Sequence, residues 1–99
     1  MRRGELRRYT RPSTPGQART VAIMSSDGIN SSPRPWLLGI ELHDRDPGDI
    51  LCIPVADHGW VYAGDLTRLY RAWTGPSLGQ LDPTILARLD GALRAALDL

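Results

Sequence analysis

The run Val21-Ala22-Ile23-Met24 constrains what this chain can fold into more than any other stretch. Four consecutive apolar residues predict a strand that other elements cover on both faces. Ser26-Asp27-Gly28 follows as a turn, in which Gly28 can adopt positive φ without steric cost. Arg19 stands two residues before the run. Because a charged side chain is costly to bury, we expect Arg19 to face a polar site where the strand begins.

Short segments with strand-like composition fill most of the remaining chain. We expect five strands, at residues 4–9, 19–24, 36–43, 50–55 and 60–63, and residues 66–73 are expected to continue the sheet beyond a kink near Gly64. The Pro-Gly pair within residues 44–49 predicts a hairpin, and Pro54 favours an edge position for the fourth strand. Residues 25–35 are expected to form a loop, and Thr74-Gly75-Pro76 to break the element before it.

The C-terminal segment predicts a helix. Asp82 is a good N-cap, and Pro83 suits the first helical position because its missing N–H costs nothing there. Apolar residues then recur at spacings of three and four, at Ile85, Leu86, Leu89, Leu93, Ala96 and Leu97. This stripe is expected to pack on a sheet or on a second subunit. The 99 residues therefore predict a single domain over residues 1–99, mainly β with a C-terminal helix (α+β), built as a small barrel-like sheet.

The arginines are unevenly distributed along the chain. Residues 1–34 hold seven arginines against two acidic residues, whereas residues 35–99 hold five against nine. All twelve basic residues are arginine, which suits bidentate phosphate contacts but also follows from a GC-rich genome. The basic first third favours an anionic partner, of which nucleic acid is the commonest.

Several common classes of protein are disfavoured. Met1-Arg2-Arg3 precedes no apolar segment, so we expect no cleaved signal peptide and a cytoplasmic location. No apolar run approaches the roughly 18–20 residues that span a bilayer. The chain lacks GxSxG, GxxxxGK, GxGxxG and HExxH motifs. Its two histidines and its single cysteine, Cys52, are too widely spaced for structural zinc, so we expect no metal and no cofactor, with Cys52 as an inert core residue.

His43 is a candidate for acid–base chemistry, since it ends an otherwise apolar strand beside a turn. It is either an ordinary surface histidine or a general acid or base, because imidazole titrates near neutral pH. The three tryptophans, Trp36, Trp60 and Trp73, could stack on bases but in so small a domain are more often packing residues.

Several segments together carry a family resemblance. Arg2-Arg3-Gly4-Glu5-Leu6 opens the chain, and Arg19-Thr20 leads through the apolar run to Ser25, Asp27 and Asn30. Residues 60–69 (WVYAGDLTRL) and a Gly79-x-Leu81 approach to the terminal helix complete the pattern. Taken over nearly the whole chain, the sequence resembles the MazF/PemK family of toxin endoribonucleases, the mRNA interferases of type II toxin–antitoxin systems.

The resemblance implies an SH3-like small barrel of the MazF/CcdB type, usually a homodimer, that cleaves single-stranded RNA without metal and is neutralised by a cognate antitoxin. Arg19 fills the position of the family's catalytic arginine. The family's catalytic threonine or serine falls on or next to His43, where this chain has no hydroxyl residue. The residues that the comparison places at RNA are Arg3, Arg7, Arg8, Ser25, Asp27 and Asn30.

The implied chemistry needs few groups. The RNA 2′-OH attacks the adjacent phosphorus and leaves a 2′,3′-cyclic phosphate. We expect Arg19 to stabilise the charge on the phosphate oxygens and His43 to act as general base on the 2′-OH. Glu41 and Ser25 are the reserve candidates.

Two alternatives remain open at the level of sequence. One is a degenerate relative that only binds RNA or an antitoxin, since fold outlives function. The other is a CcdB-like gyrase poison on the same fold, against which the helix ending Leu97-Asp98-Leu99 argues, because that group relies on a terminal Trp-Gly-Ile.

Overall fold

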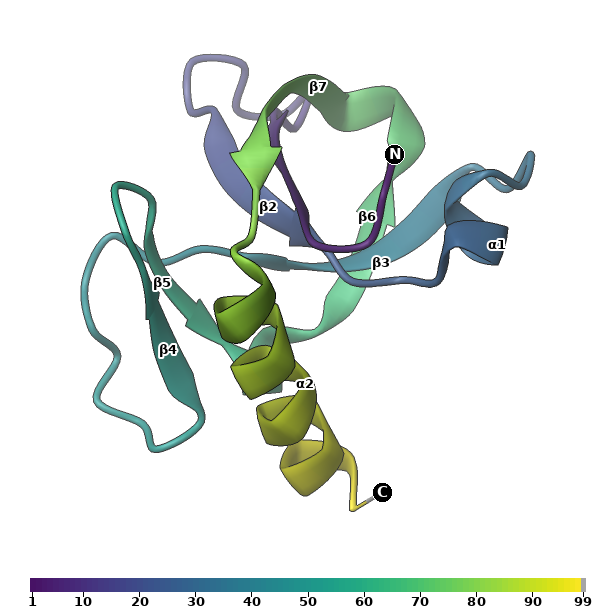
Figure 1. Ribbon diagram of the computed structural model, residues 1–99. Coiled ribbons are helices and arrows are strands. Elements are labelled where there is room, and N and C mark those ends of the chain that lie inside the picture. Colours follow the sequence, from purple (N-terminus) through teal and green to yellow (C-terminus); the bar gives the residue numbers. More distant parts are fainter. Residues whose placement is uncertain (99) are drawn as a thin grey trace.

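The computed structural model describes residues 1–98, which form two antiparallel sheets and one long helix (Figure 1). The larger sheet has the strand order β6-β3-β2-β1-β7, and the smaller contains β4 and β5. The strands are β1 (Glu5–Tyr9), β2 (Arg19–Ile23), β3 (Trp36–Glu41), β4 (Cys52–Val55), β5 (Gly59–Tyr62), β6 (Thr67–Tyr70) and β7 (Thr74–Gln80). The helices are α1 (Asp27–Asn30), α2 (Pro83–Leu97) and two 3₁₀ turns, η1 (Ala63–Asp65) and η2 (Arg71–Trp73). The expected mainly β fold with a C-terminal helix is confirmed. Since β6 and β7 end the sheet order, the small barrel is not closed.

β2 lies at the centre of the larger sheet, between β1 and β3. Val21, Ala22 and Ile23 are all completely buried. Ala22 packs into one apolar cluster, and Val21 and Ile23 pack into a second on the other side of the strand. The prediction of a strand covered on both faces is therefore confirmed.

The turn expected after β2 is wrong. Ser26 instead caps the short helix α1, its hydroxyl accepting a hydrogen bond from the Ile29 backbone N–H at 3.4 Å. Gly28 lies inside this helix and does not take positive φ. A serine followed by an acidic residue in the first turn favours a helix start as well as it favours a turn, which explains the error.

The hairpin expected at residues 44–49 is also wrong, because β3 and β4 belong to different sheets. A Pro-Gly pair indicates a bend but does not select the strand that pairs afterwards. β7 was missed for a related reason, since it runs directly through Thr74-Gly75-Pro76. Its pairing with β1 shifts register opposite Arg8, and this bulge at the sheet edge accommodates Pro76. The edge position expected for Pro54 is confirmed, as β4 pairs with β5 alone.

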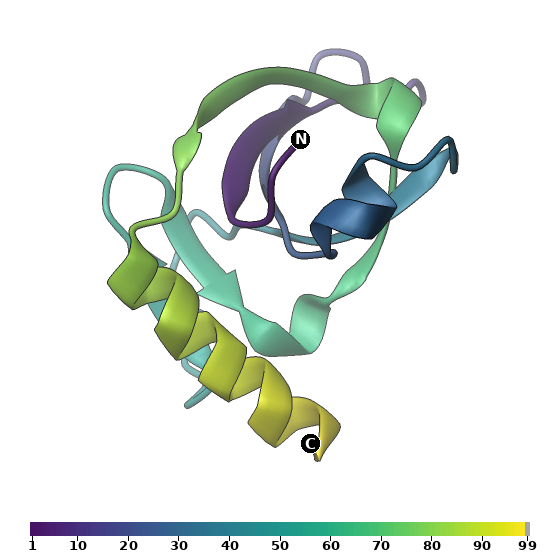
Figure 2. The ribbon, with the colours of Figure 1, turned by 45° about the vertical axis from the view of Figure 1, so that its right-hand side comes forward.

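The terminal helix is as predicted. Asp82 caps α2, its carboxylate accepting from the Thr84 backbone N–H at 2.8 Å, with Pro83 in the first turn. Leu89 and Leu93 are buried against β4 and η1, whereas the last members of the stripe, Ala96 and Leu97, are exposed. Figure 2 shows α2 outside the ring of strands, with β7 arching over the N-terminal segment. None of the helices within residues 1–98 is long and apolar enough to cross a bilayer.

Candidate active site

A groove of about 720 Å³ opens where β2 begins and β3 ends. Its lining comes from five segments of the chain: Arg19 of β2, residues 41–43 at the end of β3, the loop 44–47, Asp65 of η1 and Thr67 of β6. Arg19 and His43 were singled out separately in the sequence, and the fold brings them to the rim of this same groove. We refer to it as the Arg19–His43 groove.

Arg19 is held by a carboxylate at the rim. Its Nε lies 3.4 Å from Oε1 of Glu41, and the other oxygen of Glu41 pairs with Arg11 at 3.0 Å. The Arg19 side chain is nearly half exposed, at 47%. An exposed pair of this kind is weak, about 0–1 kcal/mol, so an incoming phosphate can displace the carboxylate.

His43 is fixed through both its backbone and its ring. Its backbone exchanges two hydrogen bonds of 2.8 Å with Trp60 of β5. Gly59 makes this approach feasible: its φ is +105°, and a Cβ there would lie 2.2 Å from the His43 carbonyl oxygen. The ring Nε2 forms a close contact with Oδ2 of Asp65. His43 is therefore an exposed histidine with a defined orientation.

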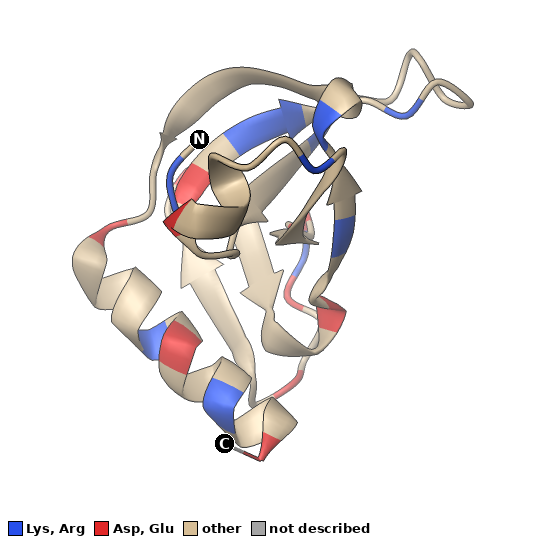
Figure 3. Cartoon of the chain, turned by 90° about the vertical axis from the view of Figure 1, so that its right-hand side faces the viewer, with Lys and Arg blue, Asp and Glu red and all other residues tan. Residues whose placement is uncertain are grey.

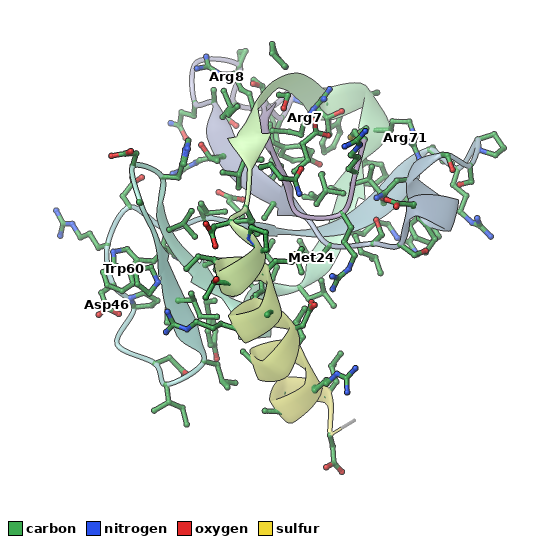
Figure 4. The ribbon with its side chains drawn as sticks, viewed as in Figure 1. Arg7, Arg8, Met24, Asp46, Trp60 and Arg71 are labelled. Carbon is green, nitrogen blue, oxygen red and sulfur yellow. The ribbon has the colours of Figure 1, made fainter. Side chains whose placement is uncertain are left out.

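Acidic residues outnumber arginines along the groove. Glu41, Asp44, Asp46 and Asp65 line it, against two arginines, Arg19 and Arg45. Asp46 lies in the loop between β3 and β4 (Figure 4). The arginines expected to give the groove a basic character are therefore not gathered there.

The three arginines predicted to bind RNA lie elsewhere. Arg3 forms an ion pair with Asp90 of α2 and donates to the Met24 carbonyl at 3.1 Å, so it ties the N-terminal segment to the helix. Arg7 is half-buried and lies 3.4 Å from Glu5. Arg8 is exposed. Figure 4 shows Arg7 and Arg8 at the upper end of the molecule, apart from the groove residue Asp46, and Figure 3 shows basic and acidic residues alternating along α2.

Glu5 interacts with two of the N-terminal arginines, Arg2 and Arg7. Burial alone would raise the pKa of the Glu5 carboxyl, but hydrogen bonds from the Ser77 hydroxyl and the Arg2 backbone N–H, together with the charge of Arg7, lower it below its usual value. These contacts stabilise the ionised carboxylate. They join β1 to β7 and to the N-terminal segment.

Ser25 and Asn30, also predicted at RNA, are almost completely buried, at 4% and 3% exposure. The Asn30 amide donates to the Ser25 carbonyl at 3.0 Å, and the Ser25 hydroxyl accepts from the Leu38 backbone N–H at 3.2 Å and bonds to the Asn30 side chain. They hold α1 onto β3 and leave no side-chain polar group at the surface. Asp27 is exposed, and its carboxylate accepts from the Arg3 backbone N–H at 3.3 Å.

Solved structures resemble this fold over its full length. An endoribonuclease in complex with its cognate antitoxin, from a mycobacterial species, aligns with a TM-score of 0.84 at 20% identity, covering 100% of this chain and 94% of that one. A MazE–MazF complex and MazF alone, both from Deinococcus radiodurans, align with TM-scores of 0.84 and 0.83 at 19% and 18% identity, covering 100% of this chain and 96% and 97% of theirs. The chain has the MazF fold. No known family model matches the sequence, and no curated protein matches it.

The MazF fold confirms the architecture that the sequence resemblance implied. The groove lining contains two further residues that the sequence reasoning missed. Asp65 and Thr67 belong to the segment Asp65-Leu66-Thr67 that contributed to the resemblance, but neither was given a role. Thr67 lies opposite Gly39 in the β3–β6 pairing and lines the groove. It therefore brings into the groove a hydroxyl that the end of β3 lacks.

Within residues 1–98, no group of three or more histidine, cysteine or acidic side chains is arranged to hold a metal ion. Cys52, expected in the core, is only half-buried. Burial, and then the charge of Asp46, raises the pKa of the Cys52 thiol, which disfavours the reactive thiolate.

Proposed function

We propose that the protein is the toxin of a type II toxin–antitoxin system, a metal-independent endoribonuclease that cleaves single-stranded RNA. The observation that carries this proposal is the meeting of Arg19 and His43 at one groove of a MazF fold. The solved neighbours are described as endoribonucleases and as MazE–MazF complexes. Cleavage of cellular RNA by such an enzyme leads to growth arrest.

Arg19 stabilises the transition state in this proposal. As the 2′ oxygen attacks, negative charge grows on the phosphate oxygens, and a guanidinium offers them a planar fork of donors. Glu41 holds Arg19 at the rim until RNA arrives. Removing one hydrogen-bond donor that stabilises the transition state typically lowers the rate by about 10²–10³-fold.

His43 acts as the general base. It takes the proton of the 2′-OH while the O2′–P bond forms and the P–O5′ bond breaks. The 5′ oxygen leaves with a proton from solvent, and the imidazolium returns one to solvent. General base catalysis of this kind contributes about 10²–10⁴ in rate.

The proposed protein partner is an antitoxin whose extended acidic segment covers the groove. Its carboxylates would pair with Arg19 and with exposed basic residues such as Arg2 and Arg8. A homodimer in the cytoplasm is the proposed working state.

The test is cleavage of RNA by purified, RNase-free protein. Wild type is expected to cut single-stranded RNA in the presence of EDTA and to leave 2′,3′-cyclic phosphate and 5′-hydroxyl ends. Arg19→Ala and His43→Ala should each lose at least about 100-fold in rate. Arg88→Ala, which removes an exposed arginine of α2, is the matched control and should retain full activity. Full activity in Arg19→Ala would refute the assignment of that residue.

A second candidate function is a non-catalytic homologue that binds RNA or an antitoxin. The four carboxylates lining the groove weigh against cleavage there and so favour a homologue without catalysis, because they oppose the approach of RNA phosphates to Arg19 and His43. Induced expression in a bacterium separates the candidates. Growth arrest with cut transcripts supports the endoribonuclease, arrest with DNA breaks supports a gyrase poison, and growth without arrest supports the non-catalytic binder.

A further inference from the structure

One of the carboxylates that line the groove, Asp65, contacts the ring of His43. Asp65 contacts Nε2 directly, whereas Glu41 is paired with two arginines. Asp65 comes from η1, 22 positions along the chain from the histidine. We propose that Asp65 is a positioning residue, which holds His43 with Nε2–H toward its carboxylate and leaves Nδ1 as the atom that accepts the 2′-OH proton.

The proposal starts from the two-point support of His43. Trp60 fixes the backbone from β5, and Asp65 fixes the ring from the 3₁₀ turn that begins directly after β5. One short segment, residues 59–65, therefore sets both the position of the histidine and the direction of its ring. An exposed side chain without a second contact would rotate about its side-chain torsions and meet the substrate in a productive geometry only part of the time.

The chemistry follows from which ring nitrogen of His43 Asp65 contacts. A carboxylate accepts a hydrogen bond, so Nε2 carries the proton and Nδ1 keeps its lone pair. When Nδ1 takes the 2′-OH proton, the ring becomes cationic, and the neighbouring carboxylate stabilises that charge. Asp65 itself gains and loses no proton, and it touches no reacting atom.

The inference rests on the proposed function, since it assigns a role in that reaction. The substrate for the test is an oligonucleotide containing the strongest site at which wild type cuts a random-sequence single-stranded RNA pool. Asp65→Ala removes the contact, and Asp65→Asn keeps the shape and one acceptor oxygen. Asp98→Asn is the matched control, because Asp98 is an exposed carboxylate at the C-terminal end of α2 and does not line the groove.

Asp65→Ala is expected to lower kcat by about 10- to 100-fold, a smaller loss than the about 10²–10⁴ expected for His43→Ala. KM should stay within about twofold of wild type, because positioning acts on the chemical step and not on RNA binding. Asp65→Asn should fall between Asp65→Ala and wild type. Asp98→Asn should keep kcat.

NMR of the His43 ring nitrogens provides a readout that does not depend on activity. In wild type the ring should show the Nε2–H form, with nitrogen shifts that change in Asp65→Ala and stay unchanged in Asp98→Asn. Unchanged ring shifts in Asp65→Ala would show that Asp65 does not orient the ring, and would overturn the proposal.

The two proposals fail in different ways. If wild type cleaves RNA and His43→Ala does not, but both Asp65 variants match Asp98→Asn in kcat, the positioning role is overturned and the endoribonuclease stands. If wild type cleaves no RNA, the proposed function and the positioning role of Asp65 in that reaction are both overturned, whatever the ring shifts show.

Discussion

Replacing Gly39 with alanine should destabilise the sheet that carries the groove. Gly39 lies in β3, between Ile23 of β2 and Thr67 of β6. A Cβ there would lie 2.5 Å from Cδ1 of Leu69 and 2.6 Å from the Ala22 carbonyl oxygen. Neither neighbour can retreat easily, because Leu69 is 1% exposed and the carbonyl belongs to the central strand. Overpacking of this kind costs about 1–3 kcal/mol.

For a domain of this size that cost corresponds to a fall in Tm of about 5–20 °C. Thermal unfolding followed by circular dichroism measures it. Gly91→Ala is the matched control, since a Cβ at Gly91 meets no heavy atom within 4 Å. In the middle of α2 this substitution should stabilise by about 0.5–1 kcal/mol. The same chemical change therefore has opposite expected signs at the two positions. A Tm for Gly39→Ala at or above that of wild type would refute the packing argument.

Four further outcomes are expected from the contacts described above. Glu41→Gln should tighten RNA binding by up to about fivefold, because Arg19 loses its carboxylate partner; weaker binding in a filter assay would contradict this. Cys52 should react with a thiol-specific reagent more slowly than free cysteine at pH 7.5, since burial raises its pKa. Glu5 has a lowered pKa, so its stabilisation is present above about pH 4.5 and is lost as the pH falls below that value; Glu5→Gln should flatten the dependence of Tm on pH there. Asp82→Ala should cost about 1 kcal/mol of stability in urea unfolding, because α2 loses its cap.

The acidic groove also bears on how an antitoxin or RNA would bind. Its carboxylates lie next to Arg19 and His43, so a polyanion meets attraction and repulsion within one site. Binding of RNA should therefore rely on few phosphate contacts, and its affinity should depend less steeply on salt than that of a basic groove.

Local patterns in the sequence were sufficient to predict those helices and strands that are determined by neighbouring residues. The apolar run 21–24 predicted a buried strand, and Asp82-Pro83 with the following stripe predicted α2. Arg19 at the start of β2 and His43 after β3 could likewise be selected as candidates, because position relative to a strand end follows from the chain itself. Whether either residue is catalytic stays a prediction.

Pairings between distant segments were decided only by the tertiary structure. The sequence could not place Asp65 on the His43 ring, Glu41 on Arg19, or Arg3 on Asp90, since each contact depends on strand order and register. It also could not show that Ser25 and Asn30 are buried while Ser26, Asp27 and Gly28 between them are exposed. Hydrophobic periodicity sets which face of an element is buried, but the neighbour on that face is chosen by the packing of the whole chain. For the groove, the sequence thus determined the candidates, and the fold determined their partners.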